Sequence, residues 1–299
     1  MSTTSAAHHD GEPGHPAQGE GRGEGRGEGR FRLIMRAPLG WMLIGVIGVG
    51  LVSGLTATGP GPLPVVGAAA AVAVYWAVMR RVAGRPVPEI DRRGAVREAL
   101  HGGGIGAGFI VLSVLVITMF GGYSFSWAGN GLVSVVAAAV MTAVGASITE
   151  ELMFRGLAMQ ALEQLWGSRA AIAITALFFG FAHLAGPTAS AWSSLAIALE
   201  AGVLLGAAFL WRRSIWFVAG LHFAWNATEQ LLGIPVSGDA VKGLLTADVD
   251  GPALLTGGAF GLEASIVPVL ISVALSVPML VLAHRRGGLL PGRTRKADR

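Results

Sequence analysis

Apolar residues along this chain gather in long runs, without the short alternations that mark the half-exposed helices and strands of soluble proteins. A helix needs roughly 20 apolar residues to cross the hydrocarbon of a bilayer. The pattern therefore predicts an all-α, polytopic membrane bundle of about eight transmembrane helices. We expect these helices at residues 41–57, 63–79, 105–120, 132–150, 170–185, 195–210, 215–232 and 266–283. The fifth and sixth are short for a span, so we expect them to be tilted or shielded by protein.

Composition supports this interpretation. The 299 residues are 53% hydrophobic and 13% charged, with a mean hydropathy of +0.60, whereas soluble domains carry about 25% charged residues. The chain has no cysteine, which excludes disulfides, thiolate catalysis and cysteine-ligated metals. Abundant Ala, Gly and Arg with only two lysines indicate a bacterial origin.

The basic residues occupy every second gap between the expected helices. Of the 22 Lys and Arg residues, only Lys242 breaks the alternation. Basic loops stay in the cytoplasm, so we predict a plasma-membrane protein with both termini cytoplasmic. The same distribution argues against a nucleic-acid partner, although the formal net charge is +4. We divide the chain into a disordered Gly/Arg/Glu-rich tail (1–36), a membrane domain (37–286) and a basic tail (287–299).

Two adjacent glutamates end the fourth expected helix. An ionisable side chain within a span is costly and is by default a functional candidate. Glu151 and Arg155 are separated by four residues and share a helix face. Glu150 points about 100° away from Glu151, so one carboxylate can be structural while the other acts as a base. The alternative is an interfacial charge cluster that ends the span.

Two histidines lie in later apolar segments. His183 ends the sequence Phe179-Gly-Phe-Ala-His183, and His222 shares a helix face with Asn226 four residues on. Taken singly, each of these is equally compatible with helix packing. One polar site in the bundle interior would account for all of them together.

The three motifs, EExxxR, FxxxH and HxxxN in this order, resemble the CPBP family of intramembrane proteases. The family includes the type II CAAX prenyl endopeptidases and the bacterial Abi and lysostaphin-resistance-like proteins. The resemblance covers residues of about 100–284, with the diagnostic part between Glu150 and Asn226. It implies an endopeptidase in which Glu150 is the general base and His183 shares the attacking water. His222 and Asn226 would then stabilise the oxyanion or hold a metal.

The resemblance also implies supporting roles for Glu151, Arg155 and Phe179. Glu150, His183 and His222 could supply three ligands to Zn²⁺ and leave a position open for water. The same groups are equally compatible with a metal-free glutamate mechanism. The expected partner besides the lipid bilayer is a peptide or membrane-protein substrate, whose identity the sequence leaves open.

The catalytic hypothesis requires that the fourth helix extend further than its apolar run. At 1.5 Å per residue, Glu150 lies about 27 Å from the start of its span, whereas His183 and His222 lie deeper in theirs. The groups meet only if the helix continues past Glu150 toward Trp166. We therefore predict this extension, together with a cavity that opens to the cytoplasm and hydrolysis near that side of the membrane.

Two other functions fit the sequence. One is a non-catalytic membrane scaffold or bacteriocin-immunity-type protein that binds a peptide through the same site. The other is a proton-coupled transporter in which Glu150, Glu200 and Glu229 form a relay. Glu200 and Glu229 have no specific role in the protease hypothesis. Each is expected to be the buried partner of an arginine or part of a wet cavity wall.

Overall fold

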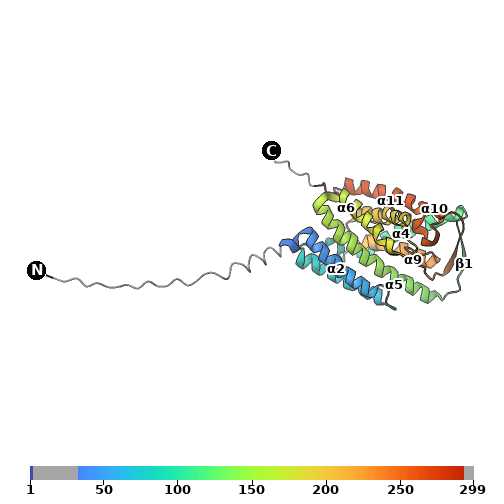
Figure 1. The fold of residues 1–299 in the computed structure, drawn as a ribbon, viewed down its shortest axis with the longest axis horizontal. Coiled ribbons are helices and arrows are strands. Elements are labelled where there is room, and N and C mark those ends of the chain that lie inside the picture. The colour runs from blue at the N-terminus through green and yellow to red at the C-terminus, as the bar shows by residue number, and fades with distance from the viewer. Residues whose placement is uncertain (3–32, 293–299) are drawn as a thin grey trace.

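The long apolar runs form a bundle of helices in the computed structural model, which describes residues 1–2 and 33–292 (Figure 1). The longer helices are α2 (Pro38–Thr56), α3 (Leu63–Ala77), α4 (Ala95–Met119), α5 (Leu132–Glu151), α6 (Gln160–Ala182), α8 (Leu204–Arg212), α9 (Ile215–Leu232) and α11 (Ile266–Arg285). Shorter helical segments are η1 (Val78–Val82), η2 (Pro88–Ile90), η3 (Leu152–Met159), η4 (His183–Ala185), α7 (Ala191–Ile197), η5 (Ala198–Val203), α10 (Ala253–Thr256), η6 (Gly258–Phe260) and η7 (Leu262–Ala264).

Six helices in the described part are long and apolar enough to cross a membrane. One of them runs from Leu132 to Ala185 and contains both the fourth and the fifth expected spans. In the stretch Ala191–Arg212, 83% of an 18-residue window is buried inside the protein, so the sixth expected segment is shielded by protein as predicted. A seventh long helix, α9, occupies the expected residues 215–232 but is too polar to be counted among the six. The chain is thus a multi-span membrane protein, and the count of eight stays a prediction.

The fourth expected helix does continue beyond Glu150, as the catalytic hypothesis required. The π-helical segment η3 joins α5 to α6 without a break. The continuous helix formed by α5, η3 and α6 first bends at Gly167. The φ of 82° and ψ of 168° at this residue lie outside helical values and are readily adopted by glycine. The π-helical segments η3 and η5 both lie in helices that approach the residues predicted to form the site. Such segments are frequent at functional sites.

Glycines let α4 and α9 approach each other closely. A Cβ on Gly102 would lie 1.9 Å from the Phe217 carbonyl oxygen, and one on Gly106 would lie 2.1 Å from the Leu221 carbonyl oxygen. Small residues at helix crossings are the usual way for membrane helices to gain packing contacts. This crossing fixes the position of α9 along the axis of α4, and with it the position of His222 in the bundle.

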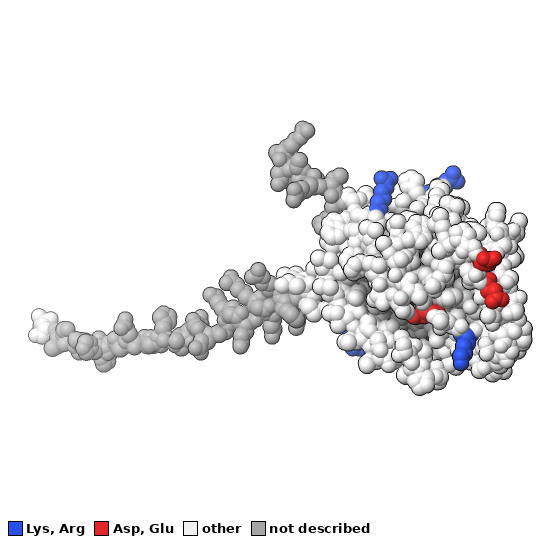
Figure 2. All heavy atoms as spheres, turned by 45° about the vertical axis from the view of Figure 1, so that its right-hand side comes forward, with Lys and Arg blue, Asp and Glu red and all other residues white. Residues whose placement is uncertain are grey.

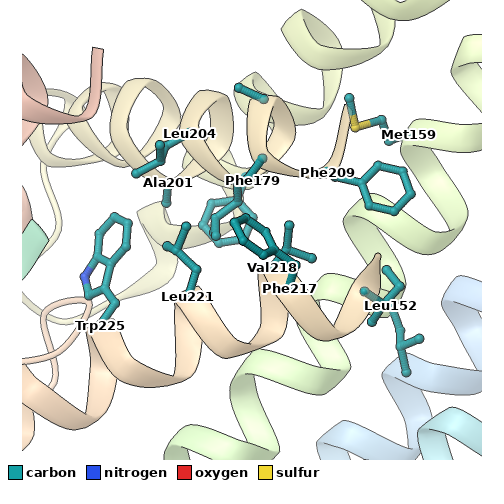
Figure 3. Close-up of a cluster of buried hydrophobic side chains, with 14 of the residues drawn as sticks. Leu152, Met159, Phe179, Ala201, Leu204, Phe209, Phe217, Val218, Leu221 and Trp225 are labelled. Carbon is teal, nitrogen blue, oxygen red and sulfur yellow. The ribbon is translucent and has the colours of Figure 1, made fainter. Parts of the chain in front are cut away.

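Phe179 lies in the middle of the hydrophobic core (Figure 3). Leu204 lies nearby on α8, and α9 supplies Val218, Leu221 and Trp225 to the same cluster. All five side chains are almost completely buried. Because α6, α8 and α9 meet here, the motif residues on α6 and α9 are brought together from distant parts of the sequence.

The bundle has two distinct ends. The start of α2 and the end of α11 lie on the same side in Figure 1, and β1 lies at the opposite end. There β1 (Tyr123–Trp127) pairs antiparallel with β2 (Leu245–Val249), with Phe125 opposite Ala247. The all-α prediction missed this small sheet. Alternating Tyr123, Phe125 and Trp127 were a period-2 signal for it.

The tails fall mainly outside the described residues. Of the predicted disordered tail (1–36), only residues 1–2 and 33–36 are described, and residues 33–36 are helical. Of the predicted basic tail (287–299), residues 287–292 are described. They pack against the bundle, since the Ser168 amide donates to the Leu290 carbonyl at 3.0 Å and Arg213 donates to the Gly288 carbonyl.

Candidate active site

The two adjacent glutamates lie in different surroundings. Glu151 is completely buried, whereas Glu150 is half-buried and lines a cavity. This difference follows from the rotation of about 100° between consecutive residues on a helix. The structure therefore separates one enclosed carboxylate from one that a ligand can reach.

Glu151 links two side chains from other parts of the fold. Its Oε1 accepts a hydrogen bond from Arg155 at 3.0 Å and from Nδ1 of His222 at 2.9 Å. Arg155, exposed by only 1%, also donates to the carbonyl oxygens of Ala201 at 2.9 Å and Gly202 at 3.3 Å. The predicted Glu151–Arg155 pair is therefore present, and it ties η3 to η5 and to α9. The bond to His222 was not expected from the sequence, because nothing in the spacing relates residues 71 positions apart.

Phe179 packs between the polar groups. The guanidinium carbon of Arg155 lies 4.9 Å from the centre of its ring, a favourable cation–π distance. The His183 ring is 4.8 Å away and the His222 ring 6.3 Å away. Phe179 thus keeps water away from the ion pair and fixes the spacing between the two histidines.

Both histidines use the ring nitrogen Nδ1 for a hydrogen bond to a neighbouring residue. Nδ1 of His183 lies 2.7 Å from the Phe179 carbonyl oxygen, which can only accept, so Nδ1 carries a proton. Nδ1 of His222 donates in the same way to the Glu151 carboxylate. A histidine ring in its neutral form with the proton on Nδ1 keeps a lone pair on Nε2. That nitrogen can then accept a hydrogen bond.

A cavity of about 730 Å³ brings together side chains from three helices. Its lining includes Glu150 at the end of α5, His183 at the end of α6 and Asn226 on α9. Oδ1 of Asn226 is buried and has no hydrogen-bond partner among the described residues. His222 lies one turn from Asn226, behind this wall and 6% exposed. The structure places Glu150, His183 and Asn226 around one space, and their catalytic roles stay a prediction.

The cavity opens at the end of the bundle opposite the start of α2 and the end of α11 (Figure 1). Its remaining walls are the loops 185–187 and 236–242. These loops contact each other through Thr188, which donates to the Gly238 carbonyl at 2.9 Å. Cytoplasmic termini and a cytoplasmic opening were both predicted from the sequence, and the two predictions cannot both hold. The depth argument fixes how far the helices extend but not which of their faces a cavity follows.

The proposed metal ligands do not assemble. Among the residues that the structure describes, no group of three or more His, Cys, Asp or Glu side chains could hold a metal ion. Glu150, His183 and His222 therefore do not form the three-ligand set that the sequence suggested, and Nδ1 of His222 is already engaged by Glu151. We assign no catalytic step to a metal.

Three further glutamates are buried close to the site. Glu200 and Glu229 are completely enclosed, and none of their carboxylate oxygens has a hydrogen-bond partner within the described ranges. The expected arginine partner is thus missing there. Sequence analysis overlooked Glu263, whose carboxylate accepts the Ser237 amide at 2.5 Å. Burial raises the pKa of Glu263.

Comparison with known families points to the same part of the chain. Residues 132–228 match the family model of the type II CAAX prenyl endopeptidases, described as Rce1-like. The matched segment runs from the start of α5 into α9 and contains every predicted site residue from Glu150 to Asn226. No curated protein and no solved structure matches the chain.

Proposed function

We propose that this chain, which belongs to the CPBP family through its Rce1-like residues 132–228, is an intramembrane endopeptidase. The family assignment supports a CAAX-protease-like enzyme in general, and the mechanism given below is our own inference. One observation supports it most directly: Glu150, His183 and Asn226 come from three separate helices and line a single cavity.

Glu150 is the general base of the proposed reaction. Its carboxylate removes a proton from a water molecule while the water oxygen forms a bond to the carbonyl carbon of the substrate. A carboxylate that lines a cavity can remove this proton when the water lies within hydrogen-bond reach of it. His183 accepts a hydrogen bond from the same water at Nε2 and helps to orient it.

Asn226 stabilises the negative charge that develops on the carbonyl oxygen. Its amide Nδ2–H group donates into the cavity, and a pre-positioned donor at this point is worth more in a dry site than in water. When the tetrahedral intermediate collapses, the carbon–nitrogen bond breaks. The proton held by Glu150 then passes to the leaving amine, which departs as a neutral group.

Glu151, Arg155 and His222 support these groups. The Glu151 carboxylate orients the His222 ring, as partner carboxylates do for histidines in other hydrolytic sites. Because His222 lies next to Asn226 on α9, its position also sets the position of the amide. Phe179 fills the space between them.

Two variants test the proposal directly. The protein is purified, returned to lipid vesicles and incubated with a library of quenched fluorescent peptides. We expect Glu150→Gln and His183→Ala each to lower the cleavage rate by at least about 10²-fold, the usual contribution of a general base. Asp248→Asn serves as the matched control, because Asp248 is an exposed carboxylate away from the cavity.

The outcome separates the protease from its main alternative. Cleavage by Glu150→Gln at the wild-type rate would refute the proposal. Peptides that bind to the wild type and to Glu150→Gln equally well, with no cleavage by either, would identify a scaffold. We further propose that the protein resides in a bacterial plasma membrane with both termini in the cytoplasm, on the strength of its alternating basic loops.

A further inference from the structure

Arginines are concentrated at one end of the bundle, which we call the basic end. It comprises the start of α2, the link from η1 to α4, the bend at Gly167, the turn between α8 and α9 and the end of α11. Its basic residues are Arg36, Arg80, Arg81, Arg85, Arg92, Arg93, Arg97, Arg169, Arg212, Arg213, Arg285 and Arg286. Cross-links such as the Arg213–Glu163 ion pair at 2.6 Å hold these segments together.

The opposite end, which we call the cavity end, carries almost no positive charge. Among the described residues there, Lys242 is the single Lys or Arg. Asp239, Asp248 and Asp250 are exposed at the same end. Figure 2 shows acidic side chains toward one edge of the described surface and further acidic atoms inside a hollow. The two ends therefore differ strongly in charge.

We infer that the cavity takes its substrate from the extracytoplasmic face of the membrane. Basic loops are retained in the cytoplasm during insertion, so the basic end faces the cytoplasm and the cavity end faces outward. The walls at residues 185–187 and 236–242 then lie on the outer side. This inference rests on the proposed function and reverses the side of hydrolysis expected from the sequence.

The depth of the cavity indicates what kind of substrate can enter. Its lining follows one face of α5 from Thr142 to Glu150, a rise of about 12 Å at 1.5 Å per residue. An extended peptide covers about 3.3 Å per residue, so about four residues must enter before a peptide bond reaches Glu150. The substrate class is therefore an unfolded segment or chain end on the extracytoplasmic side. A tail confined to the cytoplasm cannot reach the base.

Labelling of single cysteines tests the orientation, and the cysteine-free chain is a ready background for it. Asp248→Cys marks the cavity end and Arg92→Cys marks the basic end, both at exposed positions. Spheroplasts are treated with a membrane-impermeant maleimide before and after permeabilisation. We expect Asp248→Cys to react in both conditions and Arg92→Cys to react only after permeabilisation. The reverse pattern would overturn the inference.

A sided cleavage assay tests access to the cavity itself. Membrane-impermeant quenched peptides are added to right-side-out and to inside-out vesicles of equal protein content. We expect cleavage in the right-side-out vesicles alone. Cleavage confined to inside-out vesicles would refute the extracytoplasmic inference while leaving the protease in place. Peptides that stay intact in both vesicle types and in detergent would instead refute the proposed function.

Blocking the cavity from outside provides an independent check. Ala240 is an exposed residue of the cavity wall, so a bulky impermeant maleimide on Ala240→Cys fills the entrance. Cleavage by labelled right-side-out vesicles should fall at least about tenfold, the loss expected when binding weakens by 1.4 kcal/mol. The labelled Asp248→Cys protein is the matched control and should keep its rate. Equal rates for the two labelled variants would contradict the assigned entrance.

Discussion

Replacing Arg155 by methionine should destabilise the protein more than almost any other single change. The side chain is 1% exposed and makes three polar contacts, one with Glu151 and two with the carbonyl oxygens of Ala201 and Gly202. Methionine has a similar length but no charge and no donor. Arg155→Met therefore leaves the Glu151 carboxylate enclosed with His222 as its only remaining partner.

The size of the effect follows from these contacts. Removing one partner of a buried ion pair costs about 3–5 kcal/mol, because the other charge stays buried without compensation. A folded protein is stable by only about 5–15 kcal/mol. At about 2 °C per kcal/mol for a chain of this size, we expect Arg155→Met to lower the Tm by about 6 °C or more.

The fluorescence of the eight tryptophans gives a signal for thermal unfolding in detergent. Arg169→Met is the matched control, since Arg169 is exposed on the same continuous helix beyond the bend at Gly167. The double variant Glu151→Gln/Arg155→Met removes both charges and retains an acceptor for His222. Neutral replacement of a buried pair is often tolerated, so the double variant should recover at least half of the lost Tm.

Two results would refute this reasoning. One is an Arg155→Met protein whose Tm equals that of Arg169→Met, which would mean that the pair contributes nothing to folding. The other is a double variant that unfolds at a lower temperature than Arg155→Met. That outcome would mean that the lowered Tm comes from the lost carbonyl contacts and the lost packing on Phe179. The unpaired Glu151 carboxylate would then contribute nothing to it.

Three further predictions concern the crossing of α4 with α9, the small sheet and metal dependence. Gly106→Leu should lower the Tm and the yield, because its Cβ would meet the Leu221 carbonyl oxygen at 2.1 Å. Gly108→Leu should lower neither, since no atom lies within 4 Å of a Cβ at that position. Tyr123→Phe deletes a hydrogen bond to the Thr256 carbonyl and should cost about 1 kcal/mol, measured as a Tm shift of about 2 °C. EDTA should leave the cleavage rate unchanged, because the candidate ligands do not assemble; loss of activity that Zn²⁺ restores would contradict this.

Much of the helical architecture could be predicted from the apolar runs, since burial in lipid demands them. The expected starts at residues 63, 132, 215 and 266 agree with the structure. The start of α4 could not be predicted from hydropathy, because its first turns carry Arg97 and Glu98. Glu98 is held by Arg212 across the bundle, so a charged stretch that resembles a loop is helical.

The pairs of candidate residues within one helix could also be predicted from the sequence, whereas the contacts between helices could not. Spacing alone places Glu151 with Arg155 and His222 with Asn226, because residues four apart share a helix face. The bond between Glu151 and His222 depends on how α5 and α9 pack, and local spacing holds no information about that. The same limit applies to Glu263, which approaches the site only through its bond to Ser237.

The contacts of Glu151 explain why a second glutamate precedes it. Arg155 and His222 fix the Glu151 side chain from two directions, so the rotation of the helix at this point is set. Glu150 then has to point about 100° away, into the cavity that His183 and Asn226 line. A single glutamate could not be both the buried counterion and the accessible base that we propose, since full pairing would remove its ability to accept a proton. Two adjacent carboxylates meet both needs, and the buried one positions the other.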